Sequence, residues 1–128
     1  MAYANYFSSR KALTQEEKDA KRAMLTENGI RFASIPELKR YRELLILKSA
    51  GKIGEIEVHP RYPCIINGRK ICTAEFDFRY SDSSGSIIIE DVKPRGKGGK
   101  AAVQTEVSRI KRALAEQLHG ISVTIVPM

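Results

Sequence analysis

The fold is decided by residues 86–126, SIIIEDVKPRGKGGKAAVQTEVSRIKRALAEQLHGISVTIV. The apolar run at their start predicts a strand over residues 86–93. Residues 101–119 predict a helix, because their apolar side chains recur at helical spacing. Gly120 predicts the end of this helix, and the apolar residues 121–126 predict a buried final strand. We therefore expect a right-handed crossover that joins two parallel strands.

The residues upstream predict two helices. The pattern Thr14-Gln15-Glu16-Glu17 is typical of a capping box and predicts a helix over residues 15–27 that ends near Asn28-Gly29. Because this helix has few apolar residues, we expect it on the outside or against a partner. A second helix should extend from Ser34 to Gly51, with a wide apolar face.

A β-hairpin should follow the second helix. Asn67-Gly68, directly after the apolar run Tyr62–Ile66, is a strong signal for a two-residue hairpin turn. The return strand should cover Ile71–Tyr80, and residues 81–85 predict a second turn. Apolar and polar residues alternate along the return strand, which places one set of side chains on the buried face: Cys72, Ala74, Phe76, Phe78 and Tyr80.

These elements predict an α/β fold in the order helix, helix, three strands, helix, strand. We expect a single domain over residues 1–128, in which residues 1–28 form a tail and a helix and residues 29–128 form the core. The chain lacks an apolar run of the roughly 20 residues needed to span a bilayer, and its start lacks the apolar centre of a secretory signal. We therefore expect no membrane contact and a cytoplasmic location.

The distribution of charge and the cysteine content indicate which kinds of binding site the chain can contain. The 128 residues carry a net charge of +7. Residues 32–92 are neutral overall, whereas residues 93–112 hold seven basic residues and one acidic residue. Such a concentrated basic segment attracts phosphate groups, or it is simply a solvated surface. The two cysteines, Cys64 and Cys72, are interpreted as core residues, and with two well-separated histidines they exclude a zinc site of the usual spacing.

Acidic residues gather on neighbouring strands. Asp91 and Lys93 point to the same side of the strand over residues 86–93, and Glu90 points to the other. If the turn at residues 81–85 pairs this strand with the one before it, Asp77 lies close to Asp91. Converging carboxylates form a site for Mg²⁺ or Mn²⁺. Glu37, at the start of the second helix, is a third candidate carboxylate.

The motifs resemble those of the PD-(D/E)xK nuclease superfamily. More narrowly, residues 29–128 resemble a family of small phage-encoded endonucleases of the Holliday-junction-resolvase type. The superfamily's name places a proline before the first aspartate, and the sequence has none directly before Asp77. The residues that carry the resemblance are Ser34, Glu37, Tyr41, Arg42, Leu44, Asp77, Phe78, Tyr80, Glu90, Asp91, Val92, Lys93 and Lys111.

This resemblance implies a restriction-endonuclease-like α-β-β-β-α-β core, with a mixed central sheet flanked by helices, plus an extra N-terminal helix. It implies a deoxyribonuclease that uses Mg²⁺ or Mn²⁺ and leaves a 5′-phosphate and a 3′-hydroxyl. Glu37, Asp77 and Asp91 would be the metal ligands, together with the backbone carbonyl of Val92. Lys93 would orient or deprotonate the attacking water, or stabilise developing charge.

The basic loop and helix that follow the carboxylates should contact the nucleic-acid backbone. Small size favours recognition of DNA structure, as in enzymes that cut branched DNA or Holliday junctions during phage DNA recombination, replication or repair. A two-fold symmetric junction favours a homodimer, for which the first helix is the candidate contact. The residues expected to bind DNA are Lys97, Lys100, Arg109, Lys111 and Arg112.

Each assignment has an alternative. Glu37 lies three residues after Ser34 and is also explained as part of a capping box. Asp77 is also explained as the solvent face of a strand, and Asp91 with Lys93 as a surface ion pair. Other residues receive no catalytic role: His59 is interpreted as structural and Glu75 as either a supporting or a solvated residue.

The alternative functions are a non-catalytic nucleic-acid-binding accessory protein, and, on the same fold, an RNA nuclease or a phage anti-defence factor. Three acids near a phosphate oppose binding unless a cation neutralises them, which favours the nuclease.

Overall fold

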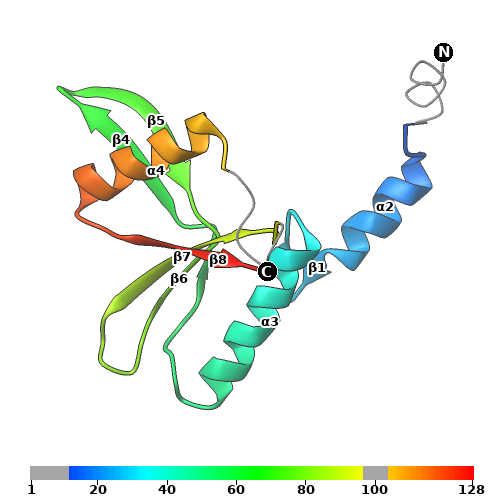
Figure 1. Ribbon diagram of the computed structural model, residues 1–128. Helices are drawn as coiled ribbons and strands as arrows, with labels where there is room; N and C mark the ends of the chain where they lie inside the picture. The colour runs from blue at the N-terminus through cyan, green and yellow to red at the C-terminus, as the bar shows by residue number, and fades with distance from the viewer. Residues whose placement is uncertain (1–11, 97–103) are drawn as a thin grey trace. The chain divides into compact units, whose positions relative to one another are not determined.

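The computed structural model describes residues 12–96 and 104–128 (Figure 1). The chain divides into two compact units, Met1–Ile35 and Pro36–Met128. The helices and strands are α2 (Gln15–Met24), β1 (Thr26–Glu27), β2 (Ile30–Arg31), α3 (Ile35–Ser49), β3 (Glu57–Val58), β4 (Arg61–Ile66), β5 (Arg69–Glu75), β6 (Phe78–Ser81), β7 (Ile87–Lys93), α4 (Glu106–His119) and β8 (Val123–Pro127).

The first unit contains the helix that the capping box predicts. The backbone N–H of Glu17 donates to Thr14 Oγ1 at 3.2 Å, and the N–H of Thr14 donates to Glu17 Oε2 at 3.1 Å. The predicted extension of the helix to residue 27 is wrong, since α2 ends at Met24. Asn28 and Gly29 instead connect β1 and β2, with φ angles of 52° and 76° that suit a two-residue hairpin turn.

The second unit is built on a mixed sheet in the order β3-β6-β7-β8. β3, β6 and β7 pair antiparallel, and β7 and β8 pair parallel, as the strand–helix–strand pattern predicts. The predicted hairpin is present as β4–β5, in which Asn67 and Gly68 have φ angles of 50° and 78°. The α/β class is therefore confirmed.

The return strand of the hairpin differs from the prediction. One continuous strand over Ile71–Tyr80 is wrong, because β5 ends at Glu75 and β6 begins at Phe78. The chain leaves the hairpin at this break and enters the central sheet, where the N–H of Asp77 donates to the carbonyl of Glu90 at 3.0 Å. Asp77 therefore lies where the two sheets meet rather than in mid-strand.

Helices pack on both sides of this framework. α4 packs against β4 and β5, and Ala115 of α4 joins a buried cluster with Tyr62, Cys64, Ala74, Phe76 and Ile89. On the α3 side, the rings of Tyr41 and Phe78 stack at 6.2 Å between centroids.

Helix α4 begins later than residue 101. Thr105 is its N-cap and Glu106 its first residue, and residues 101–103 lie outside the described part of the chain. Gly120 ends the helix in the left-handed conformation, with φ of 63°, as expected. Among the described residues, the structure contains no helix with the length and apolarity needed to cross a membrane.

Candidate metal centre and basic pocket

Two of the three predicted carboxylates meet beside an imidazole. Glu37 lies in the first turn of α3 and is 4% exposed, and Asp77 comes from the break between β5 and β6. With His59 they offer three ligand atoms that all lie within 4.8 Å of one another. Three separate segments of the chain thus converge on one point.

His59 is the residue that the sequence interpretation missed. Its Nε2 lies 2.6 Å from Oε1 of Glu37, and its backbone N–H donates to the carbonyl of Asp77 at 2.9 Å. His59 links β3 to β4 with φ of 57°. Histidine is one of the few residue types other than glycine that are enriched in this left-handed conformation. Nothing in the sequence indicates that residue 59 adopts it.

The carboxyl group of Asp77 is shifted toward its neutral form. Burial raises its pKa to about 8, and the nearby carboxylates of Glu37 and Asp91 add to the effect. A hydrogen bond of 2.6 Å from the N–H of Val92 to Asp77 Oδ2 acts in the opposite direction. Burial and the neighbouring carboxylates thus disfavour the charged form of Asp77, and a cation bound beside it would favour that form.

Asp91 and Lys93 share a face of β7 as predicted, and Lys93 Nζ lies 3.2 Å from Asp91 Oδ2. Asp91 interacts with Asp77 but is not one of the three clustered ligands. The N–H and carbonyl of one strand residue point to the same side, so the Val92 carbonyl faces the same edge of β7 as the N–H that Asp77 accepts. The role of that carbonyl as a ligand stays a prediction.

Glu90 points to the opposite face, as the alternation predicts. Arg40 of α3 binds both of its carboxylate oxygens at 2.7 Å, and the hydroxyl of Tyr80 donates to it as well. Burial and this hydrogen bond raise the pKa of Tyr80 to about 12, and the Glu90 carboxylate raises the pKa of Arg40. Arg40 lies one turn after Glu37, so this buried network fixes the part of α3 that carries Glu37.

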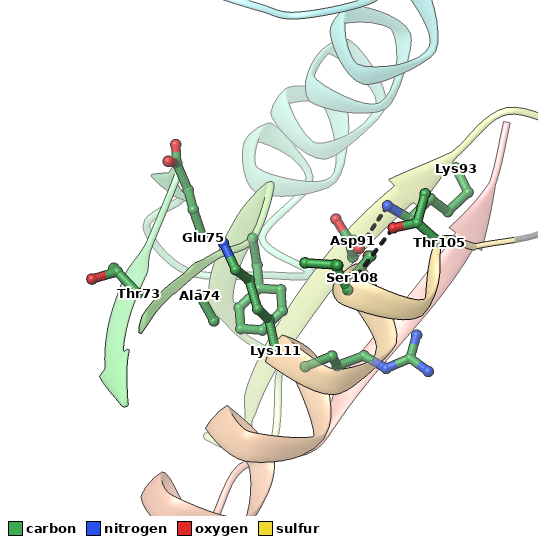
Figure 2. A pocket seen from close by; sticks show the side chains of 11 residues that line it. Thr73, Ala74, Glu75, Asp91, Lys93, Thr105, Ser108 and Lys111 are labelled. Atoms are coloured by element: carbon green, nitrogen blue, oxygen red, sulfur yellow. Dashed lines mark hydrogen bonds and ion pairs between the residues drawn. The ribbon is translucent and has the colours of Figure 1, made fainter. Parts of the chain in front are cut away.

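A basic pocket borders Asp91 (Figure 2). It encloses about 380 Å³ between β5, β7 and the start of α4. Three of the predicted cations line it: Lys93, Lys111 and Arg112. Arg112 Nη1 donates to Gln104 Oε1 at 2.6 Å. Figure 2 shows Lys111 extending from α4 toward Glu75 across the pocket.

The remaining predicted positions differ in their placement. Glu75 also lines the pocket, and Arg61 Nε lies 3.6 Å from its carboxylate. Arg109 is exposed on α4 and is not among the pocket residues. Lys97 and Lys100 lie outside the described residues.

Comparisons of the chain with protein-family models, with curated proteins and with solved structures give no significant match. The geometry of the site is therefore the basis for proposing a function. Neighbouring carboxylates are suited to a divalent cation, and the adjoining pocket presents three cationic side chains.

Proposed function

We propose that the protein is a metal-dependent DNA endonuclease that hydrolyses phosphodiester bonds, with a restriction-endonuclease-like core of the PD-(D/E)xK type. One observation carries this proposal. Glu37 and Asp77 meet at a crowded acidic point, and Asp91 connects that point to a pocket lined by three cations. A site that offers carboxylates to a metal and cations to a polyanion suits phosphodiester hydrolysis.

Glu37, Asp77 and Asp91 would hold Mg²⁺ or Mn²⁺, with the Val92 carbonyl as a further ligand. The ion would lower the pKa of a bound water and offset charge on the phosphate at the transition state. Lys93, whose Nζ lies 3.2 Å from Asp91 Oδ2, would orient or deprotonate the water, or stabilise the developing charge. Lys111 and Arg112 would hold the DNA backbone in the pocket, and Arg109 with Lys97 and Lys100 would extend this contact.

The substrate that we propose is double-stranded or branched DNA, with structure-selective cleavage at junctions during phage DNA recombination, replication or repair. The products would be a 5′-phosphate and a 3′-hydroxyl, and the enzyme would act as a homodimer in the bacterial cytoplasm. The cations of the pocket lie beside Asp91, with Lys93 on β7 and Lys111 and Arg112 on α4. This placement beside the proposed cleavage site supports contacts with the DNA backbone rather than recognition of bases.

The test is incubation of the whole protein with linear, flapped and four-way DNA, each with Mg²⁺, with Mn²⁺ or with chelator. We expect cleavage only with a divalent metal, fastest on four-way DNA, and none by Asp77→Ala or Asp91→Ala. Glu55→Gln, which neutralises an exposed carboxylate that pairs with Lys48 beyond the end of α3, is the control and should cut as the wild type does. DNA binding without metal-dependent cleavage would support the accessory-protein alternative instead.

A further inference from the structure

His59 gives the cluster a donor that the proposed magnesium site does not need. The ligand atoms of Glu37, His59 and Asp77 lie within 4.8 Å of one another, and two of them are oxygens and one is nitrogen. Ligand atoms bound at about 2.1 Å to one octahedral ion, at right angles, are about 3 Å apart. The distance of 2.6 Å between His59 Nε2 and Glu37 Oε1 is that of a hydrogen bond, and a shift of a few tenths of an ångström would bring the two atoms to the ligand spacing.

The backbone holds the imidazole in this position. The N–H of His59 donates to the carbonyl of Asp77, so two of the three ligands are linked through the main chain. Pro60, which follows, is among the most buried residues of the structure, and the Phe76 N–H donates to its carbonyl at 3.0 Å. The imidazole itself is about one-third exposed, so an ion from solvent can reach it.

We propose that His59 is a ligand of the metal centre, through Nε2, and that the centre therefore prefers Mn²⁺ to Mg²⁺. Mg²⁺ takes oxygen ligands almost exclusively, whereas imidazole nitrogen suits transition metals and carboxylate suits Mn²⁺. A mixed set of two carboxylates and one imidazole thus favours a transition metal. This inference rests on the proposed nuclease centre, and it specifies the metal that this centre takes.

A simple ion pair between His59 and Glu37 is the competing explanation. In that case His59 would compete with the metal for Glu37, and its removal would leave metal affinity unchanged or raise it for every divalent ion. As a ligand, His59 would instead contribute to Mn²⁺ affinity and much less to Mg²⁺ affinity. The two explanations therefore differ in the sign of the effect on Mn²⁺.

The experiment measures Mn²⁺ binding by electron paramagnetic resonance, together with electron spin-echo modulation from ligand nitrogen. Wild type should show imidazole nitrogen modulation, and His59→Gln should lose it and bind Mn²⁺ at least about tenfold more weakly. Mg²⁺ affinity, measured by competition with Mn²⁺ in each protein, should fall much less. His119→Gln alters the chain's other histidine, which contacts the Pro63 carbonyl, and is the matched control that should keep the signal.

Retention of the nitrogen modulation in His59→Gln, with circular dichroism showing an intact fold, would overturn the assignment. Equal or tighter Mn²⁺ binding by that variant would do the same and would identify an ion pair. Asp77→Asn distinguishes the absence of a metal centre from a centre that does not include His59. If it binds Mn²⁺ as wild type does, the proposed metal centre itself is wrong. If only Asp77→Asn weakens binding, the centre stands and His59 is not a ligand.

Discussion

At the scale of single residues, the proposed metal-dependent cleavage and the stability of the fold make opposite demands on Asp77. Its carboxylate is partly buried beside Glu37 and Asp91 and resists ionisation. Asp77→Asn should abolish cleavage and yet stabilise the metal-free protein by at least about 1 kcal/mol at pH 8, since it removes this unfavourable charge. Urea unfolding in chelator measures the stability, with Asp19→Asn as the control. An Asp77→Asn protein that unfolds at lower urea than wild type would contradict this account.

The same group predicts a pH dependence. The pKa of Asp77 is about 8 in the folded protein and about 3.9 in an unfolded chain. Between these values the folded state binds more protons than the unfolded state, so the stability contributed by this group falls as pH rises from about 4 to about 8. The stability difference between Asp77→Asn and wild type should therefore widen from pH 5 to pH 8 in chelator. A difference that is constant over that range would show that the pKa is not raised.

Lys93 and Lys111 should separate into two roles. Lys93 lies against Asp91, so Lys93→Ala should lower single-turnover cleavage in Mg²⁺ by orders of magnitude with little change in DNA affinity. Lys111 lies on α4 at the pocket, so Lys111→Ala should weaken binding to all DNA sequences alike and reduce the salt slope by roughly one unit.

Binding in Ca²⁺ and cleavage in Mg²⁺, each across a salt series, test this separation. Lys52→Ala changes an exposed lysine beyond the C-terminal end of α3 and is the control. Weaker binding of Lys93→Ala with an unchanged saturated cleavage rate would make Lys93 an anchoring residue.

Part of the site could be predicted from residues alone. The period of two along a strand correctly separates Asp91 and Lys93 from Glu90, because adjacent side chains point to opposite faces. His59 could not be found in this way. Its approach to Glu37 depends on a left-handed backbone between two short strands and on a helix 22 positions earlier, which no local pattern encodes.

At the scale of elements, α3 is fixed to the sheet by the buried Glu90 carboxylate. Arg40→Leu leaves this carboxylate, which is 3% exposed, without its cation. We expect a loss of about 3 kcal/mol in the free energy of unfolding, together with weaker cleavage because Glu37 lies on the same helix. Glu43→Gln removes the other, exposed partner of Arg40 and should change stability by less than about 0.5 kcal/mol. Urea unfolding compares the two, and equal stabilities would show that the network does not fix α3.

Two boundaries between helices and strands could not be predicted from the local sequence pattern. Asn67-Gly68 forms the hairpin turn that the sequence predicts, whereas Asn28-Gly29, the same dipeptide, forms a hairpin turn where the sequence predicts a helix end. Alternation beside Asn28-Gly29 is limited to Ile30-Arg31-Phe32, and a helical pattern precedes the dipeptide, so the local sequence does not distinguish the two structures. The break at Phe76–Asp77 is likewise hidden, because the alternation of apolar residues continues through it.

At the scale of the whole molecule, α2 is the candidate contact of the proposed homodimer. All residues of α2 are exposed, including Met24 at 58%. If the protein is a homodimer and α2 supplies the contact, Met24→Glu should replace the largest apolar side chain of the contact with a charge and dissociate the dimer. Light scattering after size-exclusion chromatography measures this. Ile46→Glu, at a 68% exposed position of α3, is the matched control and should leave the dimer intact.

Loss of the dimer should affect a junction-cutting enzyme and a nuclease that makes single cuts differently. A four-way junction offers two symmetric strands, so paired cuts within one binding event need two active sites. Met24→Glu leaves Asp77, Asp91 and Lys93 unchanged, and we therefore expect single nicks to continue while coordinated paired cuts are lost. Supercoiled plasmid carrying an extruded cruciform reports this directly, since paired cuts give linear DNA and single cuts give nicked circles. A dissociated Met24→Glu protein that still gives linear product without a nicked intermediate would show that dimerisation through α2 has no part in the reaction.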